Sequence, residues 1–579
     1  MKCEICEVGC YIEEGSLGKC RMYTVKEGVM TERFPHCYST MFPISIETMP
    51  TLHFYPNHKF LQVSSMGCNF SCGGCISEIL ITGTEILSAA LKQVSPEKVV
   101  EKALSNGCRG IVFCINDPTV SFFSFCSLAR LAKEHHLMVG FSTNAYFTRQ
   151  ALDQLIPFTD FVNIGVKGFS DDRYKACGVP SAAPVFRNIR HLFEAGVHVE
   201  VATIYMKGLE NEVRKITAFV ASLSMDIPLQ IMRFVPFGEA VMEFEPTIRE
   251  SESLCMELKK QLSHVYLFNA PGSELLDTCC PDCGRTMITR EFFGPMGSRN
   301  IETTMPGNVC SCGKEVSIKG NYALERYNEY GFFGGYRTTR AFEMLHAIMV
   351  CIGADDPEKL SALWFHLIEA DYLRAFHELV QLPESYGKII DYLAKRAGQE
   401  KNGNLLKQYI QEKFDFIQSR TQDVKRPLVY YAMGYPLFAL NSERFETNLV
   451  QAAGGTCVNK QLTREGKPGF TLTKEEFMAL NPDIIFISGF LSCPVSDFYD
   501  YCVRNDLWVN AVKNRRIYDH FPSWDFGSPR WILGLMHIAG ILHPEVFSFK
   551  MEEEADEFYQ RFYHKPFDAT HVNRSFYRG

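Results

Sequence analysis

The sequence predicts an α/β protein made of a partial (β/α)6 barrel, a cysteine-rich knuckle and a second α/β domain toward the carboxyl end. Three observations support this fold class. From about residue 60 to 240, short apolar or β-branched runs alternate with longer segments of helical period, as in parallel sheets with crossover helices. From about 275 to 320, Cys, Gly and turn residues dominate. From Arg426 onward, strand-like and helix-like segments alternate again.

Length and composition set the scale of the molecule. At one domain per roughly 100–200 residues, a chain of 579 residues predicts three or more packed units. With 46% hydrophobic and 22% charged residues, the composition is globular, and the net charge of -8 gives no long-range attraction for nucleic acid. We expect units at residues 1–58, 59–245, 246–325, 326–423 and 424–579.

The chain carries no recognisable export signal or membrane span. Its start, MKCEICEVGC, lacks the apolar region and cleavage site of a secretory signal. The longest convincing apolar run covers 12 residues, 531–542, whereas a bilayer requires about 18–20. We therefore expect a cytoplasmic protein with neither a membrane nor a nucleic-acid partner. In a reducing cytosol, clustered members of its 22 cysteines are candidate metal ligands rather than disulfides.

Six strand-helix units make up the predicted barrel. The expected strands are residues 60–65, 110–115, 138–142, 161–166, 198–203 and 229–235. Helix signals lie between them: Ser95 before Pro96, Thr148, and Gly196 after a helical segment. Right-handed crossovers would place the helices outside and the active loops at the carboxyl ends of the strands.

A CxxxCxxC motif, formed by Cys68, Cys72 and Cys75, follows the first predicted strand directly. Simple multiplication of frequencies gives about 0.03 such motifs by chance in a chain with this cysteine content. Three thiolates can hold three irons of a 4Fe-4S cluster and leave the fourth iron open to an exogenous ligand. A zinc site or a buried apolar cysteine group is the alternative for the same residues.

With its preceding strand and six βα units, the segment GCNFSCGGC at 67–75 resembles the radical SAM superfamily. The resemblance covers about 1–320 and is to the branch that includes pyruvate formate-lyase activating enzyme. It implies that S-adenosylmethionine chelates the open iron. One electron, from a flavodoxin- or ferredoxin-like donor, then yields methionine and a 5′-deoxyadenosyl radical that abstracts hydrogen. The substrate would be a small molecule or, as for activating enzymes, a glycyl radical partner protein.

The same resemblance implies cofactor-binding residues at later strand ends. They are Asn116, Asp117, Ser142, Asn144, Lys167 and Arg233. The first two belong to a NEPT-type loop that meets the methionyl amino group, and the next two to a TNG-type ribose contact. Three positions depart from the family pattern: Asp117 replaces Glu, Ala145 replaces Gly, and Gly165 stands where the family has an acidic residue.

Two further cysteine groups flank the barrel. The first, for which zinc, mononuclear iron and a second cluster all fit, comprises Cys3, Cys6, Cys10 and Cys20. Members of the activating-enzyme branch often start with a similar segment. The second group resembles a zinc ribbon, with an auxiliary iron-sulfur cluster as the alternative, and comprises Cys280, Cys283, Cys310 and Cys312. Its second pair is CxC instead of CxxC, and Cys279 is a spare.

Phrases within about 424–565 resemble class III substrate-binding proteins, which deliver iron-siderophores, haem and cobalamin to ABC transporters. They lie at 426–431, 449–455, 472–487, 511–518 and 524–531. Such proteins bind ligand between two α/β lobes. Because 338–420 is predicted to be helical, we expect a remodelled amino lobe.

A planar or anionic metal chelate would suit four residues of this domain through stacking and charge, namely Tyr431, Tyr435, Trp524 and Arg530. Core packing is the alternative for the aromatic ones. Without an export signal, delivery to a transporter is not expected, so a captured chelate or tetrapyrrole-like ligand would instead be the substrate of the radical. The alternative function is a non-catalytic cytoplasmic carrier of metal or metallocofactor.

Overall fold

The computed structural model describes residues 1–568 apart from 78–79, 82–87, 89–90, 236–241, 305–306, 330–336, 370–371, 463, 465–467, 492 and 522–523. The chain divides into two compact units. The first comprises Met1–Pro246, Glu250–Asn269 and Glu274–Thr339, and the second Thr247–Arg249, Ala270–Ser273 and Arg340–Gly579. Within the described ranges, no helix combines the length and apolar character needed to span a bilayer.

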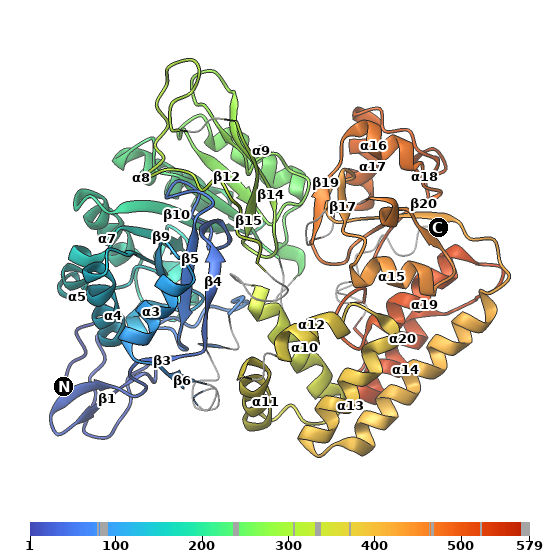
Figure 1. Ribbon diagram of the computed structural model, residues 1–579, viewed down its shortest axis with the longest axis horizontal. Coiled ribbons are helices and arrows are strands. Elements are labelled where there is room, and N and C mark those ends of the chain that lie inside the picture. The colour runs from blue at the N-terminus through green and yellow to red at the C-terminus, as the bar shows by residue number, and fades with distance from the viewer. Residues whose placement is uncertain are drawn as a thin grey trace. The chain divides into compact units, whose positions relative to one another are not determined.

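An eight-stranded sheet forms the centre of the first unit (Figure 1), in the order β12-β11-β10-β9-β8-β7-β5-β4. Its strands are β4 (Thr40–Ser45), β5 (Lys59–Ser64), β7 (Gly110–Phe113), β8 (Met138–Thr143), β9 (Phe161–Val166), β10 (His198–Tyr205), β11 (Leu229–Arg233) and β12 (Val265–Phe268). Neighbours from β5 to β12 are parallel, whereas β4 is antiparallel to β5. The sheet is open, with β4 and β12 as its two edges. All six predicted strands are present, and β4 and β12 are additional.

Helices connect the parallel strands. They are α3 (Pro96–Ser105), α4 (Phe122–Glu134), α5 (Arg149–Leu155), α6 (Asp171–Ala176), α7 (Ala183–Glu194) and α8 (Glu210–Leu223). Pro96 is the first residue of α3 as predicted, although Ser95 at the N-cap makes no side-chain capping hydrogen bond. The Thr148 hydroxyl caps α5 by accepting a hydrogen bond from the Ala151 amide at 3.1 Å. Each helix buries an apolar face, as α3 does with Val99 and Ala103.

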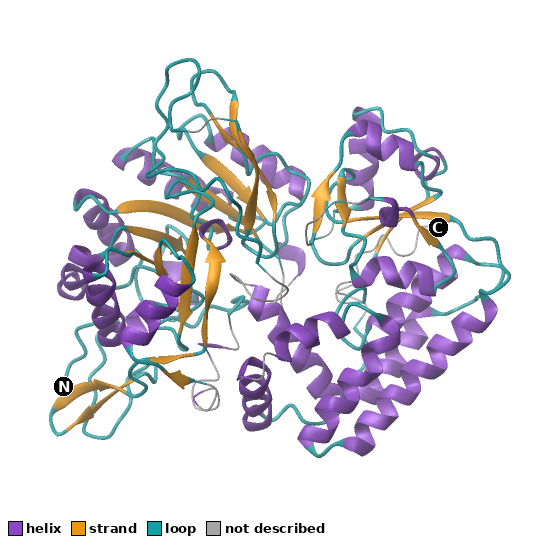
Figure 2. Cartoon of the chain, viewed as in Figure 1, coloured by secondary structure: helices purple, strands orange, loops and turns teal. Residues whose placement is uncertain are grey.

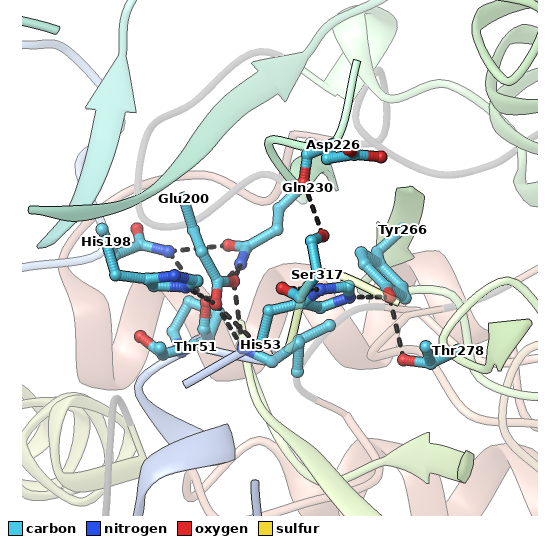
Figure 3. Close-up of polar contacts among 12 residues, drawn as sticks. Thr51, His53, His198, Glu200, Asp226, Gln230, Tyr266, Thr278 and Ser317 are labelled. Atoms are coloured by element: carbon cyan, nitrogen blue, oxygen red, sulfur yellow. Dashed lines mark hydrogen bonds and ion pairs between the residues drawn. The ribbon is translucent and has the colours of Figure 1, made fainter. Parts of the chain in front are cut away.

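A buried polar network lies near the amino ends of β10, β11 and β12 (Figure 3). The Glu200 carboxylate is fully buried and accepts hydrogen bonds from the backbone amides of Leu52 at 2.9 Å and His53 at 2.7 Å. It also accepts a hydrogen bond from the side-chain amide of Gln230 at 2.7 Å and lies 3.1 Å from Nε2 of His198. Four polar groups therefore surround one buried charge, which satisfies it away from water.

The network extends from His53 to the cysteine-rich segment. Nε2 of His53 lies 2.5 Å from the Tyr266 hydroxyl, and Nδ1 lies 3.1 Å from the Ser317 carbonyl oxygen. The Tyr266 hydroxyl is 2.8 Å from that of Thr278. Thr278 opens a small antiparallel sheet, β13 (Thr278–Cys279), β14 (Thr286–Phe292) and β15 (Ser298–Thr303). The network thus joins the knuckle to the barrel strands.

His264 packs against this network, and its lowered pKa predicts that the first unit loses stability at low pH. Its ring centroid is 4.5 Å from that of His53, and burial lowers its pKa to about 4. A histidine whose pKa falls from about 6.5 on folding stabilises the fold above pH 6.5, and that contribution is lost as the pH falls through 4. We expect His264→Gln to remove up to ~3 kcal/mol of the difference between pH 7 and pH 4 in unfolding free energy.

Urea unfolding at several pH values would measure this effect. Burial raises the pKa of Asp277 to about 6, so its contribution to stability is lost as the pH rises toward 6, opposite to that of His264. The difference between variant and wild type is therefore more informative than the pH dependence of the wild-type unfolding free energy alone. The exposed His135 provides the control substitution His135→Gln, which should keep the wild-type slope. Equal slopes for His264→Gln and wild type would contradict the assignment.

The second unit begins with five helices, α10 (Arg337–Cys351), α11 (Pro357–Glu369), α12 (Tyr372–Leu379), α13 (Tyr386–Ala397) and α14 (Glu400–Arg420). A sheet follows, formed by β16 (Leu428–Ala432), β17 (Phe438–Leu440), β18 (Thr456–Cys457), β19 (Gly469–Thr471), β20 (Ile484–Ile487) and β21 (Ile517–Asp519). Figure 2 shows this division into helices and sheet. The apolar run at 531–542 forms α19 (Trp531–Leu542), a helix buried on nearly all sides.

Candidate functional site

The loop that follows β5 carries the CxxxCxxC motif. Backbone amides approach two of its sulfurs: that of Phe70 donates to Cys68 and that of Ser77 to Cys75, both at 3.4 Å. Such contacts favour the thiolate form, which is the form that binds metal. In the opposite direction, burial raises the pKa of Cys68, and a hydrogen bond with Cys177 together with burial raises that of Cys72. A bound metal would displace these protons.

The three sulfurs of the loop are not drawn together as the ligands of one bound ion would be. Among the described residues, the only group of three or more potential metal ligands within 4.8 Å of one another lies elsewhere in the chain. The iron-sulfur interpretation of this loop therefore rests on its CxxxCxxC motif, whose three thiolates can each hold a different iron of a cube.

Lys167 lies against this loop from the end of β9. Burial opposes its charge, but the thiols of Cys72, Cys75, Cys177 and Cys68 outweigh that effect and raise the pKa of the ammonium. The cation therefore stays charged beside the cysteine loop, where it would offset the negative charge of thiolates. Contact between Lys167 and a cofactor remains a prediction.

Asn116 fixes the backbone that leads into Cys68. Its side-chain oxygen accepts a hydrogen bond from the Ser65 amide at 2.9 Å, and its side-chain nitrogen donates to the Met66 carbonyl at 3.1 Å. Both polar atoms of this predicted cofactor residue are therefore engaged within the protein. Its direct effect is to hold the cysteine loop in place.

Asp117 joins the loops that follow β7 and β8. One carboxylate oxygen accepts hydrogen bonds from the Thr119 amide at 2.9 Å and hydroxyl at 2.6 Å. The other accepts from the Thr143 hydroxyl at 2.9 Å and the Asn144 amide at 2.8 Å. The Asn144 side chain in turn donates to Asn69 at 2.7 Å, within the cysteine loop. These residues form a connected framework around the motif, while Ser142 is half-buried on β8.

Asp117→Asn should destabilise this framework by about 1–3 kcal/mol. The new NH2 group would face N–H or O–H donors that the carboxylate oxygen now accepts from. Urea unfolding of the full chain, with amide hydrogen exchange at 117–144 as a local readout, would measure the loss. Asp172→Asn changes the same chemistry on the surface, where the side chain is 87% exposed, and should have little effect. Equal stability of the two variants would show that the four hydrogen bonds contribute nothing.

Arg233 ends β11 as predicted, but its side chain is used inside the protein. The buried guanidinium pairs with Glu245 at 2.7 Å and donates to the Asn269 carbonyl at 2.8 Å. Nη2 has no hydrogen-bond partner among the described residues. This arrangement anchors the end of the strand and leaves one donor for a cofactor contact, which remains a prediction.

The thiols of the third cysteine group lie close enough together to hold one metal ion. The Sγ atoms of Cys280 and Cys312 are 3.6 Å apart, as are those of Cys283 and Cys310, and all four lie within 4.8 Å of one another. A tetrahedron with metal-sulfur bonds of 2.3 Å has edges of about 3.8 Å. The CxC pair therefore does not prevent tetrahedral geometry. Cys279 stands outside the group, 3.7 Å from the Thr286 hydroxyl.

The first cysteine group surrounds a small cavity. Its lining includes all four thiols, Cys3, Cys6, Cys10 and Cys20. Burial raises the pKa of Cys6 to about 12 and that of Cys20 to about 11, so metal binding there would release protons. The four sulfurs are not all within 4.8 Å of one another.

The predicted ligand residues of the second unit are all in contact with other protein side chains. The Tyr431 hydroxyl donates to Asp525 at 3.3 Å, and the Tyr435 ring stacks on Tyr501 with centroids 4.9 Å apart. Trp524 packs on Phe521 at 5.0 Å, and Arg530 donates to the Tyr559 hydroxyl at 3.2 Å. These contacts are those of a core, and the ligand role remains a prediction.

Sequence patterns missed several residues that the structure brings to these places. Cys177 lies beside Cys72 although about a hundred residues separate them. Asn69 occupies a variable position of the motif, and Glu200 is one acidic residue within a strand. Asp525 accepts hydrogen bonds from the Ser488 hydroxyl at 2.9 Å and the Gly489 amide at 2.8 Å. Only Asp525 had a signal, as part of the phrase at 524–531.

Comparison with known proteins supports the barrel interpretation. Residues 63–220 match the family described as the Radical SAM superfamily. The uncharacterized protein MJ0808 of Methanocaldococcus jannaschii is 27% identical over 328 residues, which cover 55% of this chain and 95% of that protein.

Solved structures similar to this chain include a periplasmic solute binding protein from Veillonella parvula, with a TM-score of 0.30 and 21% identity over 34% of this chain and 61% of that one. An ABC transporter solute binding protein from Sulfurospirillum deleyianum has a TM-score of 0.30 and 24% identity over 34% of this chain and 62% of that one. The chain thus spans about three fifths of these solved proteins. The cysteine loop at the end of β5 lies inside the range that matches the Radical SAM superfamily, residues 63–220.

Proposed function

We propose that this protein reductively cleaves S-adenosylmethionine at a 4Fe-4S cluster held by Cys68, Cys72 and Cys75. The observation that carries the proposal is the three-thiol loop after β5 of a radical SAM domain, with two amide donors on its sulfurs and the Lys167 cation beside it. When bound, the cluster supplies one electron that breaks the sulfonium carbon-sulfur bond, giving methionine and a 5′-deoxyadenosyl radical that takes hydrogen from substrate.

The residues of this chain position and shield that chemistry. The carboxyl ends of β5, β7, β8 and β9 meet at one edge of the parallel sheet, where α/β proteins place their active loops. Asn116 holds the entry to the cysteine loop, and Asp117 ties the next two loops together. Lys167 supplies positive charge. A flavodoxin- or ferredoxin-like protein would serve as the electron donor, in a reducing cytoplasm that keeps the thiols available.

The substrate that we propose is a small metal-chelate or tetrapyrrole-like ligand bound by the second unit. Tyr431, Ser488 and Asp525 gather at the carboxyl ends of β16 and β20, and the Tyr431 ring stacks on His520 just beyond β21 with centroids 5.7 Å apart. The carboxyl edge of parallel strands is where open α/β sheets bind ligands. These buried polar and aromatic groups support the choice of that edge.

Anaerobic reconstitution of the full chain would test the cleavage reaction. With S-adenosylmethionine and dithionite, we expect 5′-deoxyadenosine well above a control without protein, and methionine in equal amount. An intact cluster without deoxyadenosine would contradict the proposal and would favour a carrier of metal or metallocofactor instead.

The substrate is tested separately. Mass spectrometry of small molecules that copurify anaerobically with the full chain should identify the ligand class. A deuterated form of that ligand should then transfer deuterium into 5′-deoxyadenosine. Transfer instead from a glycine residue of a partner protein would replace the small-ligand proposal with an activating role.

A further inference from the structure

The amino-terminal cysteines and two loops of the barrel line one cavity. The thiols come from Cys3, Cys6, Cys10 and Cys20, and the opposite wall includes Asn69 and Thr119. Asn69 belongs to the cysteine loop after β5, and Thr119 to the loop after β7. The cavity thus lies between the amino-terminal segment and the loops on which the proposed chemistry depends.

The size and donors of this cavity suit a single metal ion. Its volume is about 10 Å³, close to the room that one water molecule needs. An iron-sulfur cube is larger because it contains eight atoms. Four thiols form a soft donor set of the number that tetrahedral zinc or iron takes. Cys10 and Cys20 are partly exposed, so they can move inward when an ion draws the sulfurs together.

The segment that carries these thiols has little structure of its own. Residues 1–20 contain isolated bridges rather than a sheet, including Lys2 with Tyr11 and Cys6 with Phe147. Two backbone hydrogen bonds fold the chain around the cavity, from the Cys3 amide to the Cys10 carbonyl at 2.7 Å and from the Gly9 amide to the Cys6 carbonyl at 3.0 Å. A bound ion commonly supplies the stability that so short a segment lacks.

Asn69 provides the second, independent observation. Its side chain is 3% exposed, lines the cavity and faces the Cys6 sulfur. The side-chain oxygen accepts the hydrogen bond from Asn144, and the side chain also contacts the Cys6 thiol, whose pKa it lowers. A thiolate is a stronger hydrogen-bond acceptor than a thiol. A metal-bound thiolate at Cys6 would therefore strengthen this contact, as in the outer shell of many metal sites.

A second connection runs through Thr119. Its amide and hydroxyl donate to Asp117, and its carbonyl accepts a hydrogen bond from the Tyr23 hydroxyl at 2.7 Å. Tyr23 also lines the cavity and opens the strand β1 (Tyr23–Lys26). Residues that line the cavity are therefore hydrogen-bonded to the loop after β7, and through Asn69 they belong to the CxxxCxxC loop itself.

We propose that Cys3, Cys6, Cys10 and Cys20 bind one thiolate-ligated transition-metal ion, zinc or iron, which orients Asn69 and so holds the cysteine loop of the radical SAM domain. The ion is distinct from the proposed cluster and from the ion of the Cys280 group. Its effect on the loop rests on the proposed function, whereas the binding of the ion does not.

Metal and sulfide analysis of the full chain, purified anaerobically, would test the site. The quantity compared is the number of zinc and iron ions per chain that do not belong to clusters. It is the total zinc and iron minus the cluster iron, which equals the acid-labile sulfide. Wild type should hold two such ions. Cys10→Ser or Cys20→Ser should lose one, Cys283→Ser should lose the other, and the half-buried Cys126→Ser should lose neither.

Several outcomes would overturn the site. They are a wild-type protein with no such ion, Cys10→Ser and Cys20→Ser variants that keep every ion of the wild type, and variants that lose iron and sulfide together, which would indicate a second cluster. If these variants fail to fold, Cys283→Ser still tests the site, because it should keep the amino-terminal ion. The element that is lost distinguishes zinc from iron.

The link to the cluster has its own readout. Asn69→Ala should keep both ions but alter the electron paramagnetic resonance spectrum of the reduced cluster, and Cys10→Ser should alter it in the same way. Cys283→Ser should leave the spectrum unchanged. Wild-type spectra from Asn69→Ala and Cys10→Ser would overturn the link. If wild type forms no cluster, the proposed function fails while the ion count still tests the site.

Discussion

Cys72→Ala is expected to abolish both the visible absorbance of the reconstituted cluster and the release of 5′-deoxyadenosine. Cys72 is the middle cysteine of the three-thiol loop, and a cube left with only two protein ligands would lose the geometry that leaves one iron open. Absorbance after anaerobic reconstitution and deoxyadenosine formation with dithionite would both be measured. The expected loss of product is to the level of the control without protein.

Two cysteines provide matched controls for this substitution. Cys126 is half-buried on α4, outside the three groups, and Cys126→Ala should retain cluster and activity. Cys177 touches Cys72 but lies outside the motif, so Cys177→Ala should also retain the cluster. If Cys72→Ala released deoxyadenosine like wild type, or if Cys177→Ala lost the cluster as completely, the assignment of the three ligands would be wrong.

Glu200→Ala should lower the unfolding free energy of the first unit by about 3–5 kcal/mol. The carboxylate is fully buried, and its removal leaves the backbone amides of Leu52 and His53 without their acceptor and removes one of the two acceptors of the Gln230 side chain. It also breaks the contact between β10 and the segment that precedes β5. Because the chain has two compact units, the urea transition must be assigned by amide hydrogen exchange within 50–60 and 198–231.

Glu200→Gln keeps the volume and one acceptor oxygen, so we expect it to lose less stability than Glu200→Ala. Glu194→Ala, at the exposed end of α7, should change unfolding by no more than a few tenths of a kcal/mol. A loss below about 1 kcal/mol for Glu200→Ala would mean that water replaces the carboxylate, and the network would then not hold the amino ends of the strands together.

The extent of sequence-based prediction differs between the elements of the fold. The six predicted strands are buried on both faces, so each leaves a short apolar run in the sequence. The strand β4 gives no such signal because Pro43 interrupts it, which is acceptable only at an edge of the sheet. The strand β12 is four residues long and lacks the flanking signals of the others.

The candidate sites show the same contrast. Spacing along the chain predicts the cysteine groups because their ligands are local. Whether a group holds one ion or a cluster depends on distances between sulfurs, such as the 3.6 Å between Cys280 and Cys312, which no spacing fixes. The aromatic residues proposed as ligands in the second unit are buried in contacts with other side chains, so their residue types alone did not reveal their surroundings.

The sequence by itself predicted the resemblance to the radical SAM superfamily, the three candidate cysteine ligands and the order of helices and strands, because each depends on residues close together in the chain. Only the tertiary structure decided which distant segments meet: Asp117 and Asn144 are hydrogen-bonded, Asn69 lines a cavity with the amino-terminal cysteines, and Glu200 and His53 are hydrogen-bonded. These contacts join residues up to 147 positions apart. They form because buried polar groups must find partners in the folded chain, wherever in the sequence those partners lie.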